Sequence, residues 1–151
     1  MKIAHISDLH FASSYFVREW ADNVLSVINQ EQPDLLVVTG DLTDNGYGNE
    51  FEMAKAFIDC LDAKDKLVLP GNHDARNLGY EIFEEIFGER FPCFKNEEIC
   101  VVGLDSTEPD VDDGHIGREH YGSIKENLSG HRVRILALHH HLIPIPGTGR
   151  E

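Results

Sequence analysis

Four short segments of the sequence place carboxylate, amide and imidazole side chains directly after runs of apolar residues. They are Asp8-Leu9-His10, Gly40-Asp41, Gly71-Asn72-His73-Asp74 and His139-His140-His141. Oxygen and imidazole donors without thiolates suit manganese, iron or zinc, and the set does not rank these metals. One such segment alone is a weak signal, because Asp and His often begin loops or cap helices. Four in one chain indicate a metal centre.

The elements that must position these segments alternate between short apolar runs and longer amphipathic stretches. This rhythm is typical of an α/β fold with a parallel sheet covered by helices. Strands are expected at residues 2–7, 34–39, 66–69, 99–104 and 132–138, and helices at residues 20–30, 51–61, 80–87 and 117–128. Ligands gather at the carboxyl ends of parallel strands, so we expect the four segments to meet at one edge of one sheet.

Several local features refine this outline. In the first helix Trp20, Val24, Val27 and Ile28 recur at a spacing that predicts one apolar face. The prolines and glycines from Pro144 onward predict a loop. No repeat or linker divides the 151 residues, so residues 1–151 are expected to form a single domain.

The four segments resemble the calcineurin-like metallophosphoesterase superfamily. Its blocks run Asp-x-His, Gly-Asp-x-x-Asp, Gly-Asn-His-Asp/Glu, a His near a later strand end, and Gly-His-x-His. Four of the five are present in the family order, from Asp8 to His139. The chain looks closest to the phosphodiesterase-like branch, because Gly103-Leu104-Asp105-Ser106 and a His-His run followed by Pro recur there. The resemblance implies a metallophosphoesterase-type α/β sandwich.

The resemblance also implies a role for each matching residue. Asp8 and His10 would bind the first metal ion, Asp41 would bridge both ions, and Asn72 and His139 would bind the second. Two divalent ions roughly 3.5–4 Å apart lower the pKa of a bridging water and neutralise charge on the phosphate oxygens. The expected activity is therefore hydrolysis of a phosphate ester by a metal-bridging hydroxide.

Two further residues match the substrate side of the family site. His73 would stabilise the transition state or protonate the departing oxygen, and Asp44 would hold the imidazole of His73 in its useful tautomer. Asn45 stands where protein-phosphatase members carry an arginine that grips the phosphate. We therefore expect a small phosphodiester or phosphomonoester as the substrate.

The last block of the family, Gly-His-x-His, does not occur in the sequence. The chain is therefore expected to correspond to the earlier part of such a protein. A complementing C-terminal segment or a second copy in a homo-oligomer would supply the absent imidazoles. The alternative function is a metal-binding fragment or scaffold with impaired catalysis, because lost ligands leave positions that water can fill.

Composition narrows the setting in which this chemistry would operate. Lys and Arg number 13 against 27 Asp and Glu, a formal net charge of −14, which argues against nucleic acid as the substrate. No apolar run approaches the roughly 20 residues that span a bilayer, so we expect a cytoplasmic protein without membrane contact. The three cysteines are an odd number without metal-binding spacing, and reduced thiols are expected.

A few residues keep two interpretations. Asp74 could support the site or cap the following segment, and Asp105 could stabilise a turn or line the pocket. The acidic stretch from Glu108 to Asp113 could be a solvated loop or a lid over the metals. His5 is expected to be structural, because it points away from the ligand side of its strand.

Overall fold

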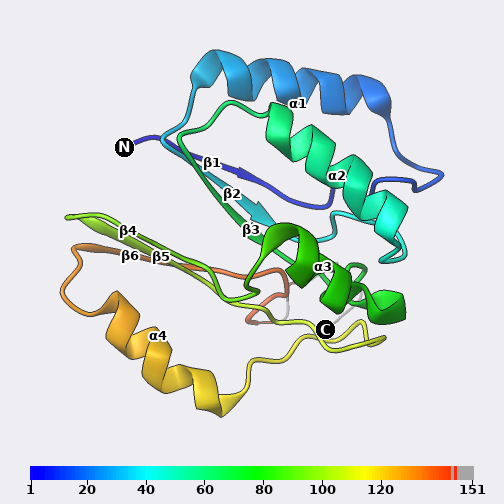
Figure 1. Cartoon of the computed structure of the whole chain (residues 1–151). Coiled ribbons are helices and arrows are strands. Elements are labelled where there is room, and N and C mark those ends of the chain that lie inside the picture. The colour runs from blue at the N-terminus through cyan, green and yellow to red at the C-terminus, as the bar shows by residue number, and fades with distance from the viewer. Residues whose placement is uncertain (144, 146–151) are drawn as a thin grey trace.

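The computed structural model describes residues 1–143 and 145 and has a first sheet of three parallel strands. These are β1 (Ile3–Ile6), β2 (Leu35–Thr39) and β3 (Asp65–Leu69), in the order β1-β2-β3. Helices α1 (Arg18–Glu31) and α2 (Gly48–Cys60) cover the outer face of this sheet (Figure 1). The expected β-then-α rhythm is confirmed for this half of the chain.

A second sheet packs against the first one and was not expected from the sequence. It contains β4 (Cys93–Lys95), β5 (Ile99–Gly103) and β6 (Val133–Ala137), with β4 antiparallel to β5 and β5 parallel to β6. Helix α4 (Tyr121–Leu128), preceded by a 3-10 turn at Arg118–His120, covers its outer face (Figure 1). The expected metallophosphoesterase-type α/β sandwich is therefore confirmed, with four layers, whereas the expectation that all four donor segments follow strands of one sheet is wrong.

Helix α3 (Gly79–Phe87) lies between the two halves of the chain. It follows a 3-10 turn at Arg76–Leu78 and packs on α2 through the aromatic rings of Phe51, Phe83 and Phe87. Gly88 ends it in a left-handed conformation with φ of 89°, which glycine adopts without a steric penalty.

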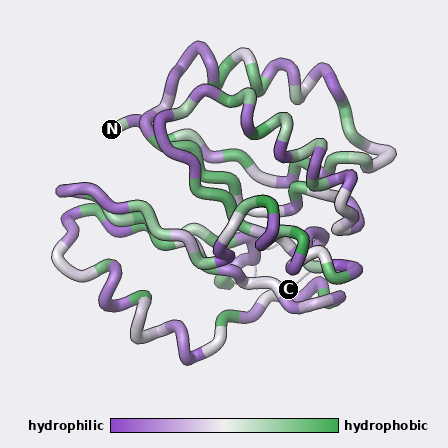
Figure 2. Tube along the Cα trace, viewed as in Figure 1, coloured by the Kyte–Doolittle hydropathy of each residue, from purple (hydrophilic) through white to green (hydrophobic). Residues whose placement is uncertain are grey.

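The core explains why the second strand is apolar throughout. All five residues of β2 are buried, because side chains on a strand alternate between its faces and both faces are covered. Leu36 and Val38 face the helices, whereas Leu35 and Val37 pack against Val101 of the second sheet. In Figure 2 the apolar colouring is accordingly concentrated along the central strands.

Some local predictions need correction. Trp20 and Val27 are 71% and 57% exposed, whereas Ile28 is buried, so the predicted apolar face of α1 does not face the core as a whole. Helical spacing identifies residues that share a face, but the position of the helix on the sheet decides which side is covered. Strand β4 escaped prediction because it has only three residues.

The remaining element boundaries agree with expectation to within a few residues. The loop predicted from Pro144 onward lies, residue 145 apart, outside the described residues. Within the described part of the chain, no helix is long and apolar enough to cross a membrane.

Candidate metal centre

The loops that follow β1 and β2 run side by side and carry the first three predicted ligands. Main-chain hydrogen bonds join the nitrogens of Asp8 and His10 to the carbonyl oxygens of Gly40 and Asp41, at 3.0 and 2.9 Å. Asp8, His10 and Asp41 all adopt left-handed conformations, with φ of 58°, 44° and 51°. Such strained backbone persists only where surrounding contacts hold it, and it concentrates at functional sites.

The loop after β3 touches the loop after β2 through two glycines. A Cβ atom on Gly71 would lie 2.3 Å from the nitrogen of Asp41, and one on Gly40 would lie 2.4 Å from the nitrogen of Gly71. Gly40 also has a positive φ of 84°. Only residues without a side chain allow this approach, which brings Asn72 and His73 to Asp41.

Asp74 fastens the same two loops together. Its fully buried carboxylate accepts hydrogen bonds from the main-chain nitrogens of Leu42, Thr43 and Gly71 and from the hydroxyl of Thr43. Burial raises the pKa of Asp74 to about 6, the hydrogen bonds oppose this shift, and the nearby Asp41 adds to it. Of the two interpretations of Asp74, the geometry favours support of the site.

Asp41 lies at the centre of the predicted ligands. Its Oδ2 is 3.4 Å from Nε2 of His10, and its Oδ1 is 3.5 Å from Nε2 of His139. Asp8 extends the group, with Oδ1 at 3.9 Å from Nε2 of His10. The two oxygens of one buried carboxylate thus face two different histidines, as a carboxylate shared by two cations would.

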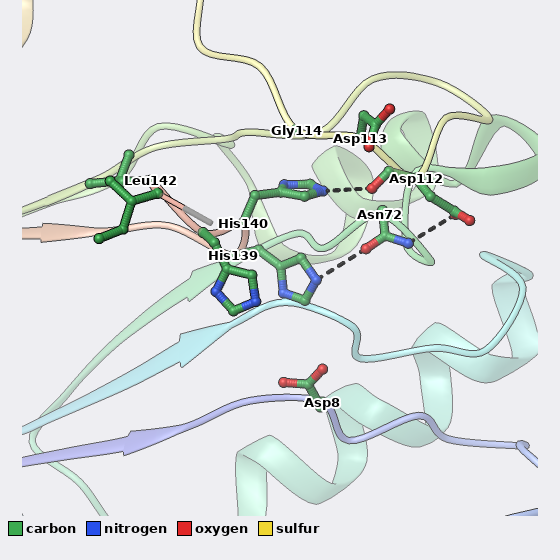
Figure 3. Close-up of a pocket in the computed structure, with 10 residues that line it drawn as sticks. Asp8, Asn72, Asp112, Asp113, Gly114, His139, His140 and Leu142 are labelled. Carbon is green, nitrogen blue, oxygen red and sulfur yellow. Dashed lines mark hydrogen bonds between the residues drawn. The ribbon is translucent and has the colours of Figure 1, made fainter. Parts of the chain in front are cut away.

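His139 reaches this position from the second sheet. Its Nδ1 donates to the carbonyl oxygen of Thr39 at the end of β2, at 2.8 Å, so the lone pair is on Nε2. That Nε2 lies 3.1 Å from Oδ1 of Asn72 (Figure 3). Asn72 completes a group that we call the ligand cluster: Asp8, His10, Asp41, Asn72 and His139.

The ligand cluster has the donor set of a cation site. With the His139 ring neutral, its Nε2, the Oδ1 of Asn72 and the Oδ1 of Asp41 approach one another as lone-pair donors without a hydrogen between them. Such mutual repulsion is relieved by a cation between them. The residues therefore fit divalent metal ions with oxygen and imidazole preferences.

His73 and Asp44 lie beside the cluster, on the side of His10. The ring of His73 packs edge-on against that of His10, with centroids 4.6 Å apart. Nδ1 of His73 donates to the main-chain carbonyl of Asp44 at 2.7 Å, whereas the carboxylate expected to orient it is 3.9 Å away. The carboxylate of Asp44 lies slightly closer to Nδ1 of His10, at 3.7 Å. The hydrogen bond that orients His73 is therefore made by the main chain of Asp44.

Two residues at the site have roles that the sequence reasoning missed. Arg76 places Nη1 at 3.0 Å from Nδ1 of His73 and donates through Nη2 to Asp112 at 2.8 Å. Asp112 also accepts a hydrogen bond from Nδ2 of Asn72 at 3.1 Å (Figure 3). These contacts lower the pKa of Asp112, with Arg76 as the largest cause and Asn72 next. No local pattern marks them, because the contact with Asn72 spans 40 residues of sequence.

The acidic loop thereby forms one wall of a cavity of about 530 Å³ beside the ligand cluster. Asp8, Asn72 and His139 line the cavity from one side, and Asp112 and Asp113 line it from the loop. Asp112 therefore contacts a predicted ligand and lines the cavity, which the interpretation as a purely solvated loop does not include.

Comparison with known proteins identifies a family whose matched region includes the ligand cluster. The family model described as calcineurin-like phosphoesterase matches residues 1–149. The chain belongs to this family. The model covers all four segments from Asp8 to His139, and with them every member of the ligand cluster.

Curated relatives of the chain share about a quarter to a third of its residues over the matched segments. The uncharacterized metallophosphoesterase YkuE of Bacillus subtilis is 30% identical over 91% of this chain and 50% of its own length. A probable glycerophosphodiester phosphodiesterase GpdQ of Arcobacter nitrofigilis is 30% identical over 93% of this chain and 57% of its own length. A probable cyclic nucleotide phosphodiesterase of Vesicomyosocius okutanii is 23% identical over 95% and 61%. The chain thus spans about half to three fifths of these relatives.

The other predicted residues of the chain have structural contacts. His5 places Nε2 at 2.7 Å from the hydroxyl of Thr39, as expected of a structural histidine. Asp105 binds Arg90 at 2.6 Å and also accepts from the nitrogen of Thr107, which supports the turn interpretation. His140 contacts the hydroxyl of Ser106 at 2.7 Å and lines the cavity.

Proposed function

We propose that this chain holds the two divalent cations of a phosphoesterase that hydrolyses small phosphodiesters or phosphomonoesters. The observation that carries the proposal is the position of Asp41 between two histidines from different sheets. Two groups of side chains could each hold an ion, and Asp41 belongs to both: His10, Asp41 and His73 form one, and Asp8, Asp41 and His139 the other.

In this proposal the five members of the ligand cluster hold the ions and the neighbouring residues act on the substrate. As the family resemblance implies, Asp8 and His10 hold one ion, Asn72 and His139 hold the other, and Asp41 binds both; Asp8 also lies within reach of the group that contains His139. When bound, the ions would supply an activated water and neutralise negative charge on the phosphate. The left-handed turns at Asp8, His10 and Asp41 fix the donors before binding, which limits the entropy lost on binding.

His73 is proposed to donate a proton to the departing oxygen. Because its Nδ1 hydrogen bonds to the carbonyl of Asp44, Nε2 is the nitrogen that can face the substrate. His73 also belongs to one of the candidate ion-binding groups, so the experiment must separate loss of metal from loss of rate.

A small substrate is supported by the relatives and by charge. Two relatives bear the names of phosphodiesterases for glycerophosphodiesters and for cyclic nucleotides. The net charge of −14 disfavours the polyanionic backbone of a nucleic acid. A small diester presents a single phosphate to the two ions and avoids this repulsion.

The test measures metal binding and turnover separately on the same variants. Calorimetric titration with Mn²⁺ should show binding that Asp41→Ala abolishes at both sites. With bis-para-nitrophenyl phosphate, His73→Ala should lower kcat by about 10²–10⁴-fold, the usual contribution of a general acid, and retain Mn²⁺. His131→Ala, which removes a half-buried histidine just before β6, is the matched control and should change neither quantity.

Two results would contradict the proposal. Manganese binding that survives Asp41→Ala would show that the ions bind elsewhere. Turnover absent from the manganese-loaded chain, with binding intact, would favour the metal-binding scaffold instead.

A further inference from the structure

A second hollow adjoins the ligand cluster and has a different lining from the acidic cavity. It measures about 510 Å³, and Asp8 lines both hollows. The wall nearest the cluster contains Asp8, His10, Asp44 and His73. A phosphate held at the ligand cluster would therefore adjoin both hollows.

The outer part of this second hollow is aromatic and apolar. Phe16, Val24 and Phe57 line it where they also pack against the core, and Phe11 connects Phe16 and Phe57 with ring centroids 4.8 and 5.4 Å away. Tyr15 and Trp20 line it as well, and they are 90% and 71% exposed. We call this lining the aromatic hollow: Tyr15, Phe16, Val17, Trp20, Val24 and Phe57.

The two hollows differ in the chemical groups they can receive. The cavity beside Asn72 is lined by Asp112 and Asp113 and suits a polar arm without negative charge. The aromatic hollow offers ring faces, which attract planar groups by offset or edge-on stacking. Exposed aromatic residues gathered beside a catalytic group mark a binding surface more often than scattered ones do.

We propose that the substrate is a phosphodiester whose departing alcohol carries a planar aromatic ring, seated in the aromatic hollow against Trp20 and Tyr15. This inference rests on the proposed function, because it uses His73 as the proton donor. Hydrolysis joins a water oxygen to phosphorus and breaks the P–O bond of one arm, whose oxygen keeps the bonding pair and takes a proton. His73 lines the aromatic hollow and not the acidic cavity, so the arm that receives its proton is the aromatic one.

Binding tests the proposal without turnover. Trp20 is the only tryptophan of the sequence, so its emission reports directly on this hollow. In the manganese-loaded chain, phenylphosphonate should quench the fluorescence of Trp20 in a saturable way. Its Kd should be at least tenfold lower than the Kd of methylphosphonate, which is measured by competition. Tyr15→Ala should reduce this preference severalfold. Tyr121→Ala, an exposed tyrosine at the start of α4, is the matched control and should leave it unchanged.

Adenosine 5′-monophosphate in the same titration distinguishes the two sources of a planar ring. Tighter binding of the adenine ring assigns the hollow to a nucleobase, and tighter binding of phenylphosphonate assigns it to a small aryl group. Either result supports the proposal. If neither ligand binds more tightly than methylphosphonate, the proposal is overturned.

A pair of diesters with leaving alcohols of similar acidity tests which arm departs. From 2-phenylethyl methyl phosphate the chain should release 2-phenylethanol, and Trp20→Ala should lower kcat/KM at least tenfold. The same variant should change kcat/KM for ethyl methyl phosphate by less than about twofold. Release of methanol, or an equal loss for both substrates, overturns the proposal. If neither diester is cleaved but phenylphosphonate still quenches Trp20 selectively, the proposed hydrolase function is wrong. The aromatic hollow would then be a binding site for planar rings without the proposed cleavage.

Discussion

The side-chain amide of Asn72 has one atom that can bind a cation and one that cannot. Its Nδ2 donates to Asp112, so its Oδ1 faces His139 and the ligand cluster. Arg76 in turn holds Asp112 through Nη2 at 2.8 Å. Asp112 therefore positions a proposed ligand without touching the metal ions, in the way that carboxylates around other metal sites do.

We predict that Asp112→Ala weakens Mn²⁺ binding about 10–100-fold, the usual effect of losing such a supporting group. The amide of Asn72 would then be free to turn its nitrogen toward the cluster. Calorimetric titration measures the affinity, and the free energy of unfolding without metal should stay within about 0.5 kcal/mol of the parent because Asp112 is exposed. Glu108→Ala removes an equal charge from the same loop and should preserve the affinity.

At the scale of the elements, the site depends on three loops held in register. The loops after β1 and β2 are paired by main-chain hydrogen bonds, and the loop after β3 approaches them through Gly71. Asp74 joins the second and third of these loops with four hydrogen bonds. Each loop on its own would be too flexible to hold its ligand in place.

Asp74→Ala should destabilise the metal-free protein by at least about 2 kcal/mol, because each buried N–H left without an acceptor costs about 1–3 kcal/mol. Urea unfolding in the presence of EDTA measures this loss. Asp59→Ala, which removes an exposed ion pair with Lys55 on α2, is the control and should cost less than about 1 kcal/mol. Equal effects of the two substitutions would show that Asp74 does not fasten the loops.

The same carboxyl group predicts a dependence of stability on pH. Burial raises the pKa of Asp74 to about 6, so the folded protein holds this proton more tightly than the unfolded chain, whose aspartates titrate near ~4. Its protonation therefore contributes stability in full below pH ~4, and this contribution is lost as the pH rises through about 6. In EDTA, the difference in unfolding free energy between the parent and Asp74→Ala should shrink between pH ~4 and pH ~7. If the difference in unfolding free energy stays constant over this pH range, the pKa of Asp74 is not raised in the folded protein.

At the scale of the whole molecule, the ligand cluster joins the two sheets. Asp8, Asp41 and Asn72 follow strands of the first sheet, whereas His139 follows β6 of the second. Nδ1 of His139 also donates to the carbonyl of Thr39 across this boundary. Bound cations would add a second link between the same two layers.

Removal of metal should therefore lower the thermal stability of the chain as a whole. At a Mn²⁺ concentration 100 times the Kd, binding adds about 2.7 kcal/mol, which corresponds to a rise in Tm of roughly 5–10 °C for a domain of this size. Calorimetric scans with Mn²⁺ and with EDTA measure the difference. His139→Ala should abolish most of it, and an unchanged Tm in the parent would show that metal does not link the sheets.

The sequence by itself determined the elements and the donor segments. Apolar runs, glycines and prolines act locally, so β2, α2 and the turns around Gly40 and Gly71 follow from residues close to them. The order of the four segments was enough to identify the family, which the match over residues 1–149 confirms. The roles of the individual ligands remain proposals.

Only the tertiary structure decided how these pieces meet. The division into two sheets, the approach of His139 from the second one, the exposure of Trp20 and the link from Asp112 to Asn72 all join segments far apart in sequence. Local patterns specify which residues share a face but not what that face will contact. Those contacts depend on how the layers pack, because the burial that favours one arrangement is shared by the whole core.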